Sequence, residues 1–142
     1  MSEHAHQAAL FTWARRPDVQ RQYRGIDLLE ASLNGVALGK AQAGKAKAAG
    51  LLKGALDLNL PVARGPFHGM RLEMKFGKNK MTAEQEWYAQ RLREEGWKVV
   101  CCWDWLAARN EIISYLTQKD LFAGDGALSH VESGSITKPT DK

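Results

Sequence analysis

Two acidic side chains and one lysine occur at spacings that would let them act together. Glu73 and Lys75 stand two residues apart in the stretch RLEMKFG (residues 71–77), so they would share one side of an extended strand. Asp57 lies in the earlier stretch ALDLNLP (residues 55–61), where leucines alternate with polar side chains. If the two stretches pair as a hairpin, Asp57 comes to the same polar side as Glu73 and Lys75.

Such a cluster would suit metal-assisted chemistry on a phosphate. Two close carboxylates repel each other unless a cation neutralises them. Hard oxygen ligands with room for water favour Mg²⁺, for which Mn²⁺ would substitute. A nearby lysine would orient the attacking water or stabilise charge on the phosphate in the transition state. The alternative is a solvated sheet face with a weak Glu-Lys ion pair, which an isolated Glu-x-Lys would favour.

Two strands must position these residues. We expect one strand to end before Pro61 and the next to run through the RLEMKFG stretch. The segment ARGPFHG (residues 63–69) between them is typical of a hairpin loop, which makes the two strands antiparallel neighbours. The core-facing positions would be Leu56, Leu58 and Leu60 in the first strand and Met70, Leu72, Met74 and Phe76 in the second.

The N-terminal part predicts two helices around a short extended run. Ser2 is expected to cap a helix that ends near Arg15, with Glu3 and Gln7 on its inward face. Residues 26–33 read as an extended run that ends at the turn dipeptide Asn34-Gly35. The alanine- and lysine-rich residues 36–50 predict a further helix.

The C-terminal part predicts a helix, a strand and a final helix. Thr82 and Gln85 are start signals for the first helix, and Gly96 follows its end. Residues 97–103 (WKVVCCW) would form a strand, and the helix that joins two strands favours a parallel crossover. Asp104 would cap the final helix. The residues that this helix should return to the core are Leu106, Ile113 and Leu116.

Together these elements predict an α/β domain with a small mixed β-sheet flanked by helices. With 142 residues, 44% of them hydrophobic, we expect one domain over residues 1–120 and a flexible tail over residues 121–142. The adjacent Cys101 and Cys102 should point to opposite faces of their strand and stay reduced. No signal peptide or apolar segment of membrane-spanning length occurs, so we expect a cytoplasmic protein that does not contact membranes.

The ordered motifs of residues 30–117 resemble the virus-type replication-repair nuclease (VRR-NUC) domain, a branch of the PD-(D/E)xK nuclease superfamily. The shared elements are an Asn-Gly after a strand, an Ala/Lys-rich helix, a Gly-x-x-Asp strand, Glu-x-Lys, Thr-x-x-Gln at a helix start, a Gly before an apolar strand and a closing amphipathic helix. Each motif is weak by itself, whereas their order is specific. The sequence departs from the family at Leu56, where a proline usually precedes the aspartate.

The resemblance implies a restriction-endonuclease-like core and a metal-dependent endodeoxyribonuclease. It implies that Asp57 and Glu73 bind Mg²⁺ together with the main-chain carbonyl of Met74, and that Lys75 acts on the attacking water. It further implies a catalytic role for Gln85 and matches Glu3 to an acidic residue of the first helix that would also face the metal. Each of the last two has an alternative, since Gln85 would also serve as a helix cap and Glu3 as a polar residue of a frayed turn.

The partner expected from the resemblance is branched DNA such as a four-way (Holliday) junction, cut by a homodimer during recombination or repair in a bacterial cell or a phage-infected host. Flap or duplex cleavage is the nearest alternative. A net charge of +4 would also suit a non-catalytic DNA-binding module. The lysines expected to contact DNA, or else only to keep the protein soluble, are Lys45, Lys47, Lys53, Lys78 and Lys80.

Overall fold

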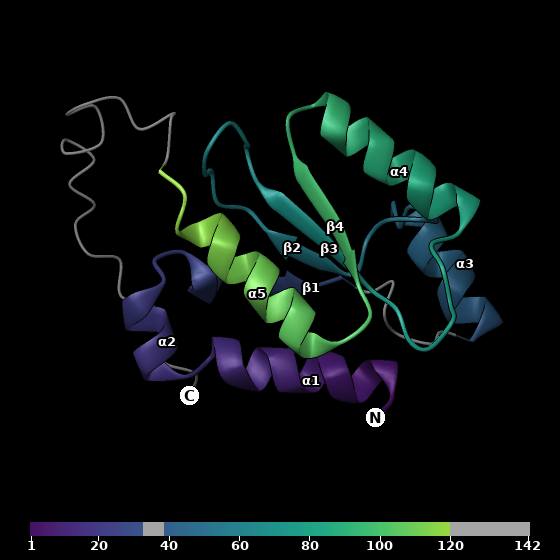
Figure 1. The fold of residues 1–142 in the computed structure, drawn as a ribbon. Coiled ribbons are helices and arrows are strands. Elements are labelled where there is room, and N and C mark those ends of the chain that lie inside the picture. The colour runs from purple at the N-terminus through teal and green to yellow at the C-terminus, as the bar shows by residue number, and fades with distance from the viewer. Residues whose placement is uncertain (33–38, 120–142) are drawn as a thin grey trace.

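A computed structural model describes residues 1–32 and 39–119. Four strands and five α-helices occur in this part of the chain, with one 3-10 turn (Figure 1). The predicted Asn34-Gly35 turn and the predicted tail lie outside the described residues. In chain order the elements are α1 (Glu3–Ala14), α2 (Pro17–Gln22), η1 (Ile26–Leu28), β1 (Glu30–Ala31), α3 (Lys40–Ala48), β2 (Leu58–Leu60), β3 (Met70–Met74), α4 (Ala83–Glu94), β4 (Lys98–Cys102) and α5 (Trp105–Leu116).

The four strands form one mixed sheet in the order β1-β2-β3-β4. The β1–β2 and β2–β3 pairs are antiparallel, and β3 and β4 are parallel with α4 as the connection, as the sequence predicted. Leu58 pairs with Leu72. One step beyond this pair, the antiparallel register brings Asp57 opposite Glu73.

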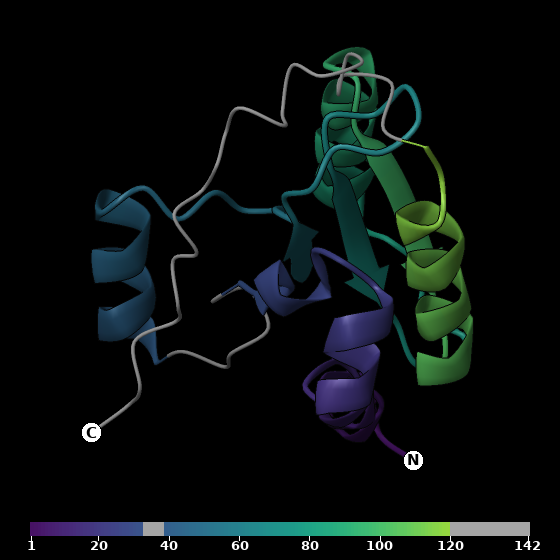
Figure 2. The same ribbon diagram turned by 90° about the vertical axis from the view of Figure 1, so that its left-hand side faces the viewer.

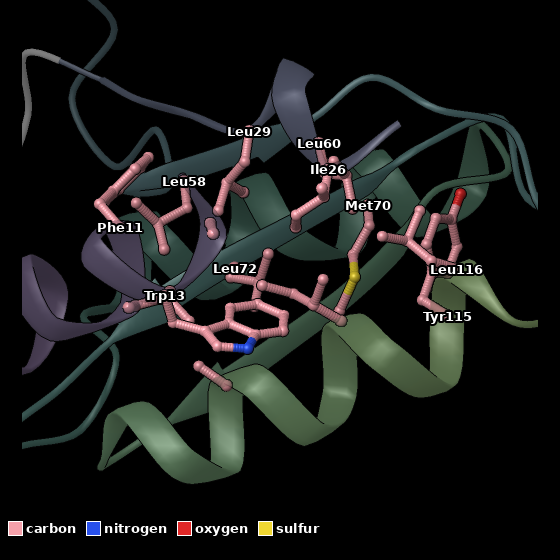
Figure 3. Close-up of a cluster of buried hydrophobic side chains, with 14 of the residues drawn as sticks. Phe11, Trp13, Ile26, Leu29, Leu58, Leu60, Met70, Leu72, Tyr115 and Leu116 are labelled. Atoms are coloured by element: carbon pink, nitrogen blue, oxygen red, sulfur yellow. The ribbon is translucent and has the colours of Figure 1, made fainter. Parts of the chain in front are cut away.

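Helices α1 and α5 cover one face of the sheet, and the main core lies between these layers (Figures 1 and 3). A second, smaller hydrophobic cluster joins α4 to β4 and to the segment before β2. It consists of Ala89, Val99 and Leu56. Helix α3 stands away from the sheet and buries none of its residues (Figure 2). The strand residues in the main core are Leu58, Leu60, Met70, Leu72, Met74 and Cys102.

The alternating pattern overestimates the length of both central strands. Strand β2 starts at Leu58, so Leu56 is buried but belongs to the cluster beside α4 rather than to the leucine row. Strand β3 ends at Met74, and the chain then turns at Gly77 with a φ of 60°. Phe76 is consequently 45% exposed and not part of the core.

Two other predictions from the pattern were wrong. Leu106 is 46% exposed, because the buried stripe of α5 runs through Ala108, Ile112 and Tyr115, on the other side of the helix. Within the extended run predicted for residues 26–33, the described residues 26–32 form a 3-10 turn followed by the two-residue β1 rather than one continuous strand. This turn places Ile26 and Leu29, three residues apart, in the same core.

Candidate active site

Asp57, Glu73 and Lys75 meet at one end of the two central strands, β2 and β3. Glu73 is near the end of β3, and Asp57 directly precedes β2, which runs in the opposite direction. The Asp57 backbone N–H donates to Glu73 Oε2 at 3.0 Å, and the Met74 backbone N–H donates to Asp57 Oδ2 at 3.2 Å. Each carboxylate is therefore fixed by the main chain of the other strand, which is the juxtaposition that the sequence predicted.

The second oxygen of Glu73 receives two further partners. Lys75 Nζ lies 3.3 Å from Glu73 Oε1, and Gln85 Nε2 donates to the same oxygen at 2.7 Å. The Lys75 and Glu73 side chains are only 13% and 2% exposed, so this ion pair is buried and not the solvated pair of the alternative interpretation. A buried carboxylate with charge-assisted hydrogen bonds on both oxygens is held in one orientation.

Gln85 forms the helix cap that the sequence predicted and also contacts the acidic cluster. Its backbone N–H donates to Thr82 Oγ1 at 3.1 Å, and its side-chain Oε1 accepts from the Thr82 N–H at 2.9 Å, which together form a capping box. Its Nε2 is left to donate to Glu73. One amide therefore caps α4 and positions a site carboxylate at the same time.

At Gly54 the loop before β2 approaches the first turn of α4 closely. Its φ is 89°, and a Cβ on it would lie 2.7 Å from the carbonyl carbon and oxygen of Glu84. We predict that Gly54→Ala shifts the first turn of α4, lowers stability by roughly 1–3 kcal/mol and weakens the Gln85 contact with Glu73.

The matched control for this prediction is Gly50→Ala. Gly50 also has a positive φ, 106°, but a Cβ there would meet no atom within 4 Å. Chemical denaturation of both variants separates the cost of the backbone conformation from the cost of the close approach. Equal losses of stability would show that the contact with Glu84 has no effect.

The charge of Asp57 opposes the ionisation of the nearby Glu73 and Glu3 carboxyl groups. Burial, and next the charge of Asp57, raise the pKa of Glu73 to about 7. Burial also raises the pKa of Asp57, partly offset by the hydrogen bond from Met74 and by the charge of Lys75. The pKa of Glu3 is raised by burial and then by Asp57, so the start of α1 lies within electrostatic range of the cluster.

His6 links the start of α1 to α5, although no sequence motif pointed to it. Its Nδ1 accepts a hydrogen bond from the Trp105 backbone N–H at 3.2 Å. This N–H belongs to the first turn of α5 and has no partner within that helix. The contact joins residues 99 positions apart and ties α1, which carries Glu3, to the start of α5.

Cys101 is a second residue of this region to which no sequence motif pointed. It pairs with Glu73 in the parallel β3–β4 ladder, so the two side chains share a face of the sheet. Burial, and next the charge of Glu73, raise the pKa of its half-buried thiol. Cys102 points into the main core, and burial raises its pKa to about 12; both cysteines are free, on opposite faces as predicted.

The donor set of the cluster fits a hard cation. Burial raises the pKa of both carboxyl groups, and the charge of Asp57 raises that of Glu73 further, which is the electrostatic situation that a divalent ion relieves. Within residues 1–32 and 39–119, no three His, Cys, Asp or Glu side chains converge closely enough to hold an ion alone. An ion bound by Asp57 and Glu73 would therefore complete its shell with main-chain oxygen and water, as Mg²⁺ commonly does.

The five predicted DNA-binding lysines are exposed and lie on three separate segments. Lys53 pairs with Glu84 at 3.3 Å, which places it at the start of α4, next to Gln85. Lys78 and Lys80 are exposed on the loop between β3 and α4. Lys45 and Lys47 are exposed on the last turn of α3, the helix that stands apart (Figure 2).

Comparisons with known proteins identify the fold. No protein-family model matches the sequence, and no curated protein matches it significantly. A solved structure of a "VRR_NUC domain protein" is similar to this chain with a TM-score of 0.70 and 25% sequence identity, over 84% of this chain and 92% of that one. The match confirms the fold class expected from the sequence. In the part of the chain that is described, no helix combines the length and apolar character needed to cross a bilayer.

Proposed function

We propose that this chain, which has the fold of a VRR-NUC domain, is a Mg²⁺-dependent endonuclease that hydrolyses phosphodiester bonds in DNA. The observation that carries the proposal is the contact of the buried Asp57 and Glu73 with the partly buried Lys75 and Gln85, at one end of the two central strands. Buried carboxylates in contact with a lysine cost stability, so a structural role alone gives little reason for them.

Each residue of the cluster would have a distinct part in the reaction. Asp57 and Glu73 would hold the ion, with the Met74 carbonyl as a further ligand and Glu3 near enough to add negative charge. When bound, Mg²⁺ would polarise the phosphate and favour ionisation of a water. Lys75 would orient the attacking water and offset the charge that develops on the phosphate. Gln85 would keep the Glu73 carboxylate in place through its 2.7 Å hydrogen bond.

The bond that breaks joins the phosphorus to one of its two ester oxygens. The water oxygen bonds to phosphorus as the P–O3′ bond breaks, and the leaving oxygen takes up a proton. The products are then a 5′-phosphate and a 3′-hydroxyl, the outcome that the superfamily resemblance favours. Lys53, Lys78 and Lys80 would bind the flanking phosphates, with Lys45 and Lys47 reaching DNA farther from the cut.

The substrate that we propose is branched DNA, including four-way junctions, cut by a homodimer. A two-fold symmetric pair of sites would match the symmetry of a junction. The alternatives in the same reaction class are flap and duplex cleavage. A DNA-binding module without catalysis is supported by the net charge of +4, but two buried carboxylates would repel the phosphate unless a cation is bound.

The test is a cleavage assay on a junction, a flap, a linear duplex and a single strand of matched sequence. We expect strand cleavage with Mg²⁺ or Mn²⁺, none in EDTA, and the highest rate on the junction. Cleavage at equal rates on all four DNAs would reject the branched substrate only. Binding to DNA without cleavage under any metal condition would favour the non-catalytic module.

A further inference from the structure

A small pocket of about 240 Å³ adjoins the Glu73 side of the proposed active site. It lies between the loop that follows β3, the first turns of α4 and the end of β4. Its lining is mostly apolar and consists of Lys80, Met81, Glu86, Cys101 and Trp103.

One strand pairing and one chain neighbour place this pocket next to the proposed catalytic cluster. Cys101, which lines it, is the ladder partner of Glu73 and lies on the same face of the sheet. Glu86, which also lines it, directly follows Gln85, whose side chain donates to Glu73. A phosphate held at Asp57, Glu73 and Lys75 would therefore bring the next nucleotide of its strand to the mouth of the pocket.

Trp103 gives the pocket an aromatic wall of fixed orientation. Its Nε1 donates to the Asn79 carbonyl at 2.8 Å, which joins the end of β4 to the loop after β3. The residue nevertheless remains 45% exposed. An indole that is anchored at its polar atom while much of its surface stays open is arranged as a stacking surface.

We propose that this pocket binds one unpaired DNA base adjacent to the cleaved phosphate, with Trp103 as the stacking partner. The proposal rests on the proposed function and adds how the substrate is selected. The pocket is smaller than the roughly 300–1,000 Å³ typical of sites for drug-sized ligands, so it suits a single base. Lys80 would contact the adjoining phosphate, and the Glu86 carboxylate would accept from an exocyclic amino group.

An unpaired base is the form of DNA that such a pocket selects. A base inside a duplex must first lose its stacking and pairing to enter, whereas a base at a branch point or flap has already done so. Every base has a π-face, so stacking on Trp103 would select DNA shape with little dependence on sequence. The pocket would thus give structure selectivity to the active site.

The experiment uses a branched DNA that carries 2-aminopurine, a fluorescent base quenched by stacking, at the unpaired position beside the cut. Binding is measured with Ca²⁺ in place of Mg²⁺, so that fluorescence and affinity are read without cleavage. We expect quenching by the unaltered protein, loss of quenching in Trp103→Ala with roughly 5- to 100-fold weaker binding, and retention of both in Trp103→Phe.

Trp87→Ala is the matched control. Trp87 is 57% exposed on α4 but does not line the pocket, so its removal should leave quenching and affinity unchanged. Thermal unfolding of the three variants checks that each is folded, and Trp103→Phe isolates the aromatic face from the Asn79 hydrogen bond.

Two results would overturn the pocket proposal. One is the absence of quenching in the unaltered protein bound to this DNA, and the other is an equal effect of Trp103→Ala and Trp87→Ala. If either occurs while the unaltered protein still cleaves DNA with Mg²⁺, the base pocket is refuted and the nuclease function stands. Quenching without any cleavage would instead refute the nuclease function.

Discussion

Lys75→Met is expected to reduce Mg²⁺-dependent DNA cleavage by roughly 10²–10³-fold or more while the protein stays folded. Methionine keeps much of the length of the side chain but removes the cation that lies 3.3 Å from Glu73 Oε1. The loss should appear mainly in kcat, because the charge that Lys75 offsets develops in the transition state. Single-turnover cleavage of a junction substrate measures it.

Lys98→Met provides the control for this substitution. Lys98 is partly buried and lies at the start of the adjacent β4, where its Nζ is 5.6 Å from the centre of the Phe67 ring. Cleavage by this variant should match that of the unaltered protein. Undiminished cleavage by Lys75→Met would remove Lys75 from the mechanism.

Asp57→Asn is expected to abolish cleavage and yet to stabilise the metal-free protein at alkaline pH. Asparagine retains an oxygen that can accept the Met74 N–H but removes a buried charge and its repulsion of Glu73. Without the charge, two-carboxylate binding of the ion is lost. We expect Mg²⁺ to raise the Tm of the unaltered protein at pH 8 and to leave the Tm of Asp57→Asn unchanged.

The pH dependence of stability follows from the same groups. The pKa of Glu73 is raised from 4.5 to about 7, so the folded state holds this proton more tightly than the unfolded chain. The resulting stability is fully present below pH 4.5 and is lost as the pH rises through about 7. From pH 5 to pH 8 the unfolding free energy of the metal-free protein should fall by a few kcal/mol, on the order set by the pKa shift.

In Asp57→Asn this fall should be smaller, because burial still raises the pKa of Glu73 but the neighbouring charge does not. Asp18→Asn is the control, since Asp18 is exposed and paired with Arg16. Urea denaturation of the unaltered protein and both variants at several pH values, with EDTA and with Mg²⁺, measures these differences in unfolding free energy. A metal-free protein whose stability is the same at pH 5 and pH 8 would contradict this account of the cluster.

The sequence predicted the features of the site that depend on local patterns. Alternation placed Glu73 and Lys75 on one side of a strand, and the hairpin brought Asp57 to them. The Thr82 and Gln85 signals gave the start of α4 correctly. These features come from residues close in sequence or from one antiparallel turn, where the register leaves few alternatives.

Features that join distant segments were not predictable in this way. The register of the parallel β3–β4 pair determines that Cys101 lies beside Glu73, and no turn fixes that register in the sequence. The His6 contact depends on how α1 packs against α5. Leu56 fits the leucine pattern, yet its packing near α4 takes it out of the row because the strand begins only at Leu58.

The shared hydrogen bonds of Gln85 restrict which amino acids position 85 can accept. Glutamate would complete a capping box with Thr82 as well as glutamine does. It would, however, place a third carboxylate against Glu73 Oε1, where the glutamine now donates from Nε2 at 2.7 Å. Gln85→Glu is therefore conservative for the helix cap but unfavourable for the site. An amide fits this position better than an acid because the Glu73 carboxylate lies next to it.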